Sequence, residues 1–512
     1  MKTPLVLLLV PVLAWSSAPS PDHNEFEAAL HAPFRAPASG ARTFTLAFDY
    51  PHLAAPLPVY WRLEVTLAGV PVAQWRGQAE LRGAPVDVRI DWGGANQAGI
   101  YTARMTAHAG DTEAVQDWDV LVGAPVTALA PPQRQLVDLP WDVYYGNLHS
   151  QTNHSDGGAA LGACHGAQPP HSAPFGPRDA YTYARGRGLD FLLTSEHNHM
   201  FDGSAGANPD ASPEQARARF HLGLAEAAQF TAAHPDFLAL YGLEWGVIAN
   251  GGHLNILNGT ELLGWETGQD GAPVADTVTP RGDYAGLYRL MRARGWLGQF
   301  NHPASTGQFV VDDVALGYTR DGDEAMALCE VVNTNAFSTN DSETETRRTL
   351  FEGACNKALE AGYHVAFSSN QDNHCANWGT AYTNRTGVLV ARGQPYNRSA
   401  FLDAVRARRV FATMDKTAQL VLIANGHVMG ARFVNRGPLT LTAHFASSAG
   451  RQAASVRLME GVPGRNGKVS LLSELPALTF APAPGAHFYY ARVTQDDGNI
   501  LWSAPVWVTQ TR

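Results

Sequence analysis

Six short segments rich in His, Asp, Glu and Asn carry most of the chemistry that this sequence offers. They span 146–157, 194–199, 242–245, 252–255, 301–303 and 371–374, and most of them directly follow an apolar run. Imidazole and carboxylate ligands together suit zinc, manganese or iron, and a bridging carboxylate suits a centre of two or three ions. The segments therefore predict a site for divalent metals. Its candidate ligands are five histidines and three carboxylates: His149, Asp156, His197, Glu244, His253, His302, Asp372 and His374.

The elements that must position these residues repeat as strand then helix between residues 141 and 415. Apolar strands are predicted at 191–194, 238–241, 297–300, 327–332 and 364–369, and helices at 177–187, 213–232, 284–294 and 344–361. This alternation predicts a parallel α/β fold, and at least five units favour a barrel. A doubly wound sheet is the alternative, although no Gly-rich phosphate loop follows the first strand. The carboxyl ends of barrel strands meet on one face, which would bring the polar segments together.

The regions on either side alternate apolar and polar residues with a period of two, which is typical of antiparallel strands. Phe44 and Leu46 belong to the first such region, and Leu439 and Leu441 to the second. We expect an immunoglobulin-like β-sandwich over 19–124, a Pro-rich linker over 125–140, the α/β part over 141–415 and a second sandwich over 416–512. Residues 1–18 combine Lys2, an apolar run and small residues, which predicts a signal peptide and an exported protein, periplasmic or secreted.

The overall composition argues against several partners and catalytic schemes. The 512 residues carry a formal charge of −10, whereas binding to duplex nucleic acid needs clustered Lys and Arg. No segment after the start is apolar for long enough to span a membrane, and no Gly-x-Ser-x-Gly motif indicates a serine hydrolase. The four cysteines allow three full pairings or a reduced state. We favour Cys164 with Cys375, because the loops that carry them must reach the same face if the ligands converge.

The motifs, taken in order, resemble those of the PHP (polymerase and histidinol phosphatase) superfamily. They read Leu-His-x-x-Thr-x-x-Ser-Asp-Gly over 148–157, then a strand-end His, a Glu, a His, Asn-His-Pro and Asp-x-His. Residues 409–413 and 502–508 further resemble the carbaryl-hydrolase-like branch of that superfamily. The resemblance covers roughly 141–415, and it implies a distorted seven-stranded (β/α) barrel with up to three divalent metal ions.

The resemblance also implies how the ligands divide among the ions, and it shows two departures. Gln151 stands where the family has a ligating His, and a neutral amide oxygen would hold the first ion weakly. Glu196 stands where the family has an Asp, and it would support the neighbouring His as an outer partner. The three implied sets are His149, Glu244 and Asp372; Glu244, His253 and His302; and Asp156, His197 and His374.

Four further residues are candidates for substrate binding. Arg385 and Arg409 would grip a phosphate with their planar guanidinium groups, and His154 and His199 lie close to the ligand motifs. A metal-bound hydroxide would attack the substrate, for which a small phosphate ester is favoured. Hydrolysis of a carboxyl ester, carbamate or amide is the alternative within the same class. A degenerate metal scaffold that only binds a partner is the alternative from another class, and Gln151 is the one feature that favours it.

Overall fold

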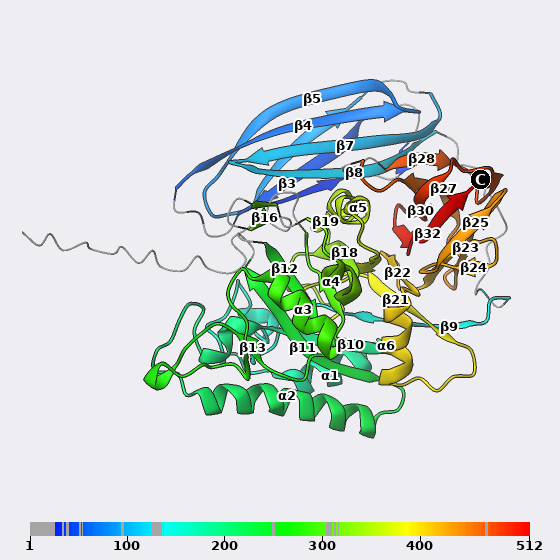
Figure 1. The fold of residues 1–512 in the computed structure, drawn as a ribbon. Coiled ribbons are helices and arrows are strands. Elements are labelled where there is room, and N and C mark those ends of the chain that lie inside the picture. Colours follow the sequence, from blue (N-terminus) through cyan, green and yellow to red (C-terminus); the bar gives the residue numbers. More distant parts are fainter. Residues whose placement is uncertain are drawn as a thin grey trace, which may run out of the picture.

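The computed structural model describes residues 26–32, 35–36, 40–50, 53, 55–93, 97–123, 136, 138–247, 251–303, 310–311, 314–315, 317–465 and 469–512. The predicted signal peptide (1–18) and most of the predicted linker (125–140) lie outside these residues. The described chain is a mixed α/β protein that is rich in sheet, with six α-helices and β-sandwich-like sheets (Figure 1). None of the helices in these residues is both long and apolar enough to cross a membrane.

Two sheets pack together in the N-terminal part, which lies above the rest of the chain in Figure 1. Alternation along the strands buries Phe44 and Leu46 in one sheet and Leu63 and Met105 in the other. The predicted period of two therefore corresponds to a shared apolar core. The first sheet has the order β1 (Glu27–His31), β3 (Arg42–Asp49), β6 (Val86–Trp92); the second has the order β2 (Arg35–Ala36), β8 (Thr112–Val122), β7 (Gly99–Ala109), β4 (Leu57–Leu67), β5 (Val70–Leu81).

The central part contains the parallel strands that the alternating pattern predicts. Neighbouring pairs β9/β10, β10/β11, β15/β18 and β18/β20 are parallel, and β12 lies antiparallel between β11 and β15. Apart from β9, whose first five residues are half-buried, the strands are buried along nearly their whole length, as expected for strands covered on both faces. Their bounds are β9 (Trp141–Asn147), β10 (Phe191–His197), β11 (Leu238–Val247), β12 (Gly252–Ile256), β15 (Gly298–Phe300), β18 (Met326–Thr334) and β20 (Ala366–Ser369).

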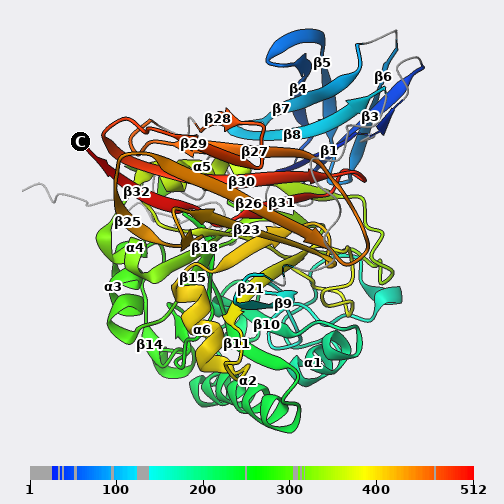
Figure 2. The ribbon, with the colours of Figure 1, turned by 90° about the vertical axis from the view of Figure 1, so that its right-hand side faces the viewer.

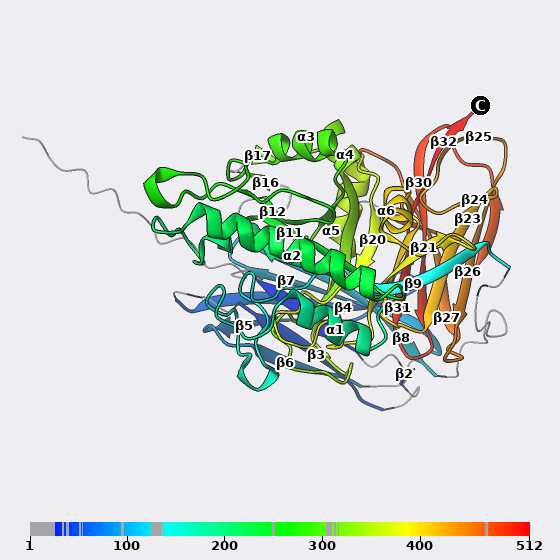
Figure 3. The same cartoon turned by 90° about the horizontal axis from the view of Figure 1, so that it is seen from below.

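Helices cover the outside of these strands, and α2 lies along β11 (Figure 3). Local signals fix their ends: the Ser212 side chain caps α2, the Asp283 side chain caps α3, and Gly295 ends α3 with φ +68°. The helix predicted over 344–361 is wrong in its first half, because residues 348–350 pair with β18 as β19 (Arg348–Leu350). The helices are α1 (Pro177–Gly186), α2 (Pro213–Ala233), α3 (Tyr284–Arg294), α4 (Arg320–Ala325), α5 (Glu352–Ala361) and α6 (Arg398–Arg406).

The C-terminal part continues the central sheet without a break. Strand β9 pairs with β21, β21 with β22, and β22 with β31, so one sheet of 16 strands runs from the centre into the C-terminal part (Figure 2). A separate four-stranded sheet, β24-β23-β26-β29, packs nearby. The larger sheet uses β21 (Arg385–Ala391), β22 (Val410–Thr413), β25 (Arg432–Arg436), β27 (Ala453–Gly461), β28 (Ser470–Ser473), β30 (Gly485–Gln495), β31 (Ile500–Ser503) and β32 (Val506–Thr511); the smaller uses β23 (Ala418–Ala424), β24 (His427–Val428), β26 (Leu439–Ser447) and β29 (Ala477–Phe480).

A buried ionic network joins the three parts of the chain. Asp119 on β8 lies 3.1 Å from Arg457 Nη1 and 3.3 Å from Arg492 Nη1, and both arginines belong to the C-terminal part. Arg492 also lies 3.3 Å from Glu352 at the start of α5. Burial raises the pKa of Asp119, but the two arginines outweigh burial and hold the pKa below its usual value. The Asp119 carboxylate is therefore charged in the folded protein, and it neutralises the two arginines of the C-terminal part.

We predict that Asp119→Ala destabilises the protein by ~3–5 kcal/mol, because it leaves buried guanidinium groups without their counter-charge. The measurement is the midpoint of chemical denaturation. Asp117→Ala is the matched control, because Asp117 lies on the same strand and pairs with Arg104 at the surface, where a lost pair costs about 0–1 kcal/mol. Equal shifts for the two variants would contradict the prediction.

Candidate metal centre

The candidate ligands come from strand ends that meet at one end of the central sheet. His197 is the last residue of β10 and is paired in register with Glu244 on β11. His149 follows β9 by two residues, and His302 follows β15 by two residues. The loop after β20 returns to β9, since Gln151 N donates to Asn373 O at 2.9 Å. This contact places Asp372 and His374, on either side of Asn373, beside the loop that carries His149.

The side chains form three groups, buried except at the partly exposed His302, in which ligand atoms of His, Asp and Glu lie close enough to share an ion. Nitrogen-to-oxygen distances between members of one group run from 3.0 to 3.7 Å. Atoms bonded to one ion at about 2.0–2.2 Å are themselves about 3.0–3.6 Å apart, so the residues present fit divalent metals. The groups are His149, His302 and Asp372; Asp156, His197 and His374; and His197, Glu244 and His253.

Glu244 lies between the groups, and its two oxygens face different imidazoles. Oε1 is 3.0 Å from His253 Nδ1 and 3.3 Å from His302 Nε2. Oε2 is 3.0 Å from His149 Nε2 and 3.6 Å from His197 Nδ1. A carboxylate with one oxygen toward each pair has the geometry of a bridge between two ions.

The charges of this cluster shift its pKa values strongly. Burial alone raises the pKa of Glu244, but His149, His253 and His197 outweigh it and hold the pKa well below its usual range. Burial lowers the pKa of His149, but Asp372, Glu244 and a further carboxylate, Glu330, outweigh it and raise the pKa well above its usual value. The imidazoles therefore gain positive charge beside these carboxylates, and a bound divalent cation would supply that positive charge in their place.

The group of Asp156, His197 and His374 agrees with the third set that the family resemblance implies. His374 Nδ1 lies 2.8 Å from Asp372 O, a carbonyl that can only accept, so Nδ1 carries the proton. This leaves the lone pair on His374 Nε2, which faces Asp156 Oδ1 at 3.4 Å. His197 Nε2 faces the same oxygen at 3.7 Å. The other two groups contain the predicted ligands but divide them differently from the implied sets.

Two candidate ligands hold a backbone conformation that is uncommon for residues other than glycine. His302 has φ +23° and Asp372 has φ +48°. Such conformations cost on the order of 1–3 kcal/mol each and concentrate at functional sites. The surrounding structure therefore holds both side chains in place against a local preference for other conformations.

Glu330 is a site residue that the sequence analysis did not identify. It lies fully buried on β18, and its carboxylate is 3.2 Å from His149 Nδ1. The sequence feature that could have revealed Glu330 is that it is the single acidic residue inside the apolar run 327–332. A charged side chain at such a position needs partners, and this pointed to a polar interior on that side of the strand.

Gln151 lies beside Glu244, but it presents its amide nitrogen. Nε2 donates to Glu244 Oε2 at 2.6 Å, and Oε1 lies 3.0 Å from Ser155 Oγ. The predicted ligand position is therefore next to the centre, yet its side chain acts here as a hydrogen-bond donor to the central carboxylate.

Glu196, the second departure from the family pattern, accepts from Thr152 Oγ1 at 2.6 Å and from Ser155 Oγ at 2.7 Å. It therefore anchors the loop between His149 and Asp156.

The two histidines predicted to bind substrate have different surroundings. His154 is buried, with Nδ1 2.7 Å from the Tyr241 hydroxyl, and burial lowers its pKa to about 3. Tyr241 packs against α2 at Gly223, so His154 lies on the helix side of β11, and its substrate role stays a prediction. His199 is also largely buried, and its ring lies parallel to the Trp265 ring at 6.0 Å and 5.8 Å from the His197 ring.

The two arginines predicted to hold phosphate are engaged elsewhere. Arg385 is buried; it pairs with Glu343 Oε1 at 2.7 Å and donates to the carbonyl oxygens of Tyr382 and Asn384. Arg409 lies over the Trp141 ring, at the end of β9 opposite His149. The partners of both guanidinium groups lie outside the three ligand groups, and a phosphate-binding role for either arginine stays a prediction. The sequence alone did not indicate that Arg385 would pair with Glu343, which lies 42 residues away along the chain.

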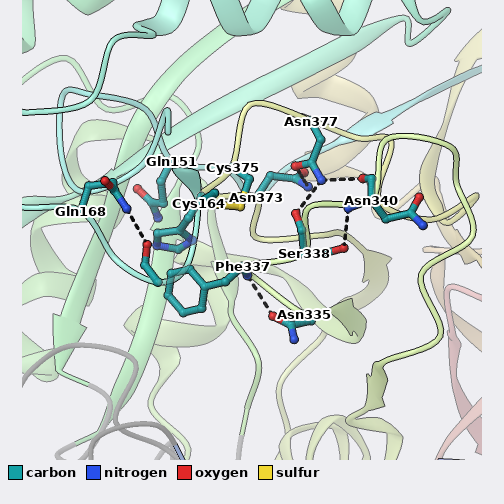
Figure 4. Close-up of a disulfide and its surroundings, with 12 residues drawn as sticks. Gln151, Cys164, Gln168, Asn335, Phe337, Ser338, Asn340, Asn373, Cys375 and Asn377 are labelled. Atoms are coloured by element: carbon teal, nitrogen blue, oxygen red, sulfur yellow. Dashed lines mark hydrogen bonds between the residues drawn. A yellow bond between two sulfur atoms is a disulfide. The ribbon is translucent and has the colours of Figure 1, made fainter. Parts of the chain in front are cut away.

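A disulfide ties two of the ligand loops together. Cys164 is bonded to Cys375, as predicted, and Cys329 is bonded to Cys355. Figure 4 shows the first bond beside Gln151, with a group of asparagines on its other side. In that group Asn377 Nδ2 donates to Ser338 O at 2.7 Å, which joins the loop after β20 to the loop after β18. His374 is thus held by a covalent bond at the next residue and by an amide network beyond it.

Comparison with known proteins adds little to this geometry. No family model matches the chain, and no curated protein matches it. The CARDB domain of a Pyrococcus furiosus protein, in complex with di-metal ions, is 12% identical over 20% of this chain and 96% of that chain, with a TM-score of 0.17. A β-glucosidase from Listeria innocua is 16% identical over 20% of this chain and 16% of its own, with a TM-score of 0.15. A β-glucuronidase from Parabacteroides merdae is 8% identical over 95% of this chain and 64% of its own, with a TM-score of 0.16. At these TM-scores the likenesses carry no argument.

We predict that Gln151→His tightens divalent-ion binding by about tenfold, or ~1.4 kcal/mol, because an imidazole replaces an amide donor beside Glu244. Isothermal titration with Zn²⁺ after chelation measures the change. Gln168→His is the matched control, since Gln168 lies in the loop that carries Cys164 and its amide donates to Gly166 O. Unchanged affinity in Gln151→His, or equal tightening in the control, would contradict the prediction.

Proposed function

We propose that this protein is a multinuclear metal-dependent hydrolase of the PHP type that cleaves phosphate esters. The observation that carries the proposal is Glu244, a buried carboxylate with a different pair of imidazoles at each oxygen. Such an arrangement is expensive to bury without cations and is suited to two ions that share one bridge.

The topology supports a distorted (β/α) barrel as the scaffold. Strands β9, β10 and β11 are parallel neighbours, as are β15, β18 and β20, and each of them except β18 ends within three residues of a candidate ligand. An isolated bridge between Ser150 and Asn373 brings the end of β9 to the loop after β20. The order of strands and ligands along the chain is the same as the order of motifs that resembles the PHP superfamily.

When bound, the ions would activate a water molecule and neutralise negative charge that develops on the substrate. The protein's own residues do the rest. Glu244 and Asp372 are held in their charged forms by the surrounding imidazoles. His374 keeps its proton on Nδ1 through Asp372 O, which orients Nε2 toward Asp156. Each side chain is therefore oriented before an ion arrives, and little rearrangement is needed on binding.

The substrate class rests on charge balance. Asp156, Glu244 and Asp372 neutralise only part of the charge of two or three divalent ions, and a phosphate ester can supply the remaining negative charge. Arg385 and Arg409 have partners outside the ligand groups, and this specific observation favours the second candidate. That candidate is hydrolysis of a carboxyl ester, carbamate or amide, whose single carbonyl oxygen needs fewer positive groups.

We also propose an exported location, periplasmic or secreted. The pattern of residues 1–18 supports it, and so do two disulfides in a chain whose four cysteines are all paired. Disulfides of this kind persist in oxidising compartments and are rare in the reducing cytosol.

We predict that protein purified without chelator carries two or three divalent ions per chain. Chelation should abolish hydrolysis, and Mn²⁺ or Zn²⁺ should restore it. Asp372→Ala should lower turnover by more than about 100-fold, beyond what loss of an outer partner usually causes. Elemental analysis and steady-state kinetics measure these effects, with Asp117→Ala as the surface control. Less than one ion per chain after reconstitution would contradict the multinuclear proposal.

We further predict that phosphate esters, and diesters somewhat more than monoesters, are cleaved faster than carboxyl esters. Matched p-nitrophenyl substrates give kcat/KM for each class on the same metal-loaded protein. A preference of tenfold or more for the carboxyl ester or carbamate, ~1.4 kcal/mol of transition-state stabilisation, would reject the phosphoesterase assignment and favour the second candidate.

A further inference from the structure

We propose that Glu330 is a positioning residue that sets the affinity of the metal centre for one of its ions. It acts through two candidate ligands, His149 and His302, which belong to the same group. The inference rests on the proposed function only in assuming that the centre binds divalent ions. It does not depend on the substrate or on the reaction.

The carboxylate of Glu330 contacts both ligands directly. Its Oε1 lies 3.2 Å from His149 Nδ1, and its Oε2 accepts from the backbone nitrogen of His302 at 2.7 Å. Asn370 Nδ2 donates to Oε1 at 3.1 Å, and Asn333 Nδ2 lies 3.4 Å from Oε2. Glu330 has no exposed surface, so these four groups account for its surroundings without solvent.

The contact with His149 determines which ring nitrogen can bind an ion. A neutral imidazole has one donor and one acceptor nitrogen. An imidazole bound to an ion is neutral, and with Nδ1 donating to Glu330 its lone pair would be on Nε2, which lies 3.0 Å from both Glu244 Oε2 and Asp372 Oδ1. A carboxylate in this outer position also makes the imidazole a stronger base and therefore a better ligand.

The contact with His302 acts on the backbone. His302 has φ +23°, a conformation that residues other than glycine rarely adopt. Its N–H is directed at a charged acceptor, and a charge-assisted bond is roughly twice as strong as a neutral one. Glu330 therefore offsets part of the strain that aims His302 Nε2 at Glu244 Oε1, 3.3 Å away.

Glu330 is not placed to bind the same ion itself. Both of its oxygens face His149 Nδ1 and the His302 backbone, whereas the ion would lie at Nε2 on the other side of the His149 ring. Asn370 extends the support, because its Oδ1 accepts from the backbone of Leu148 at 2.8 Å. The Glu330–Asn370 pair thus fixes both the ring of His149 and the chain immediately before it.

The test compares Glu330→Ala and Glu330→Gln with the native protein by metal titration. Glu330→Ala should weaken one ion by about 10- to 100-fold and lower the stoichiometry by one ion per chain in dilute metal. Glu330→Gln should show a smaller loss, since an amide oxygen can still accept from His149 but carries no charge. Co²⁺ substitution adds a spectroscopic readout, because the visible spectrum reports the ligands of each ion.

Glu360→Gln is the matched control, a buried carboxylate on α5 that belongs to none of the three groups. Native affinity and stoichiometry in Glu330→Gln would overturn the inference, even if Glu330→Ala fails to fold. Equal losses in Glu360→Gln would overturn it too. A native protein that binds no ion would overturn both this inference and the proposed function. Loss of one ion in the Glu330 variants, in a protein without hydrolase activity, would support this inference and reject the proposed function alone.

Discussion

The burial of carboxylates among imidazoles at one end of the parallel strands is the constraint on which the rest of the structure depends. Asp156, Glu244 and Asp372 are almost completely removed from water, and burial alone would oppose their charged forms. Each charge is tolerable only where imidazole nitrogens or cations stand within a few ångströms. Strand register, loop conformation and outer partners such as Glu330 all serve to keep those distances short.

Rigid loops are the second requirement, because several ligands lie just beyond the strands that carry them. A loop would normally be the most mobile part of such a fold. Here the disulfide between Cys164 and Cys375 closes a separation of 211 residues, and Trp378 Nε1 donates to Gln151 O at 2.9 Å. The two links join the first and last ligand loops to each other. Their combined effect is to make the centre behave as part of the core.

The sequence predicted these features unevenly, for physical reasons. Polar residues directly after apolar strands meet where strands are parallel, so chain order indicated the ligand positions and favoured Cys164–Cys375 among three possible pairings. The roles of Glu330 and Arg385 did not, because each depends on a partner distant in sequence: His149 for Glu330 and Glu343 for Arg385. The helix predicted over 344–361 failed similarly, since pairing with β18 outweighed helical propensity at 348–350. The local sequence pattern therefore predicts where the ligands lie, whereas contacts between residues distant in sequence determine what each side chain does.

The continuous sheet gives the C-terminal part a structural connection to the metal centre. Strand β9 leads to His149 and is paired on one side with β10 and on the other with β21, and through β22 and β31 the same ladder reaches the C-terminal strands. Asp119 adds the N-terminal part through its two arginine partners. A strand with neighbours on both sides cannot shift in register without breaking both ladders. The flanking parts therefore constrain the position of His149 even though, among the described residues, they contribute no member of the three ligand groups.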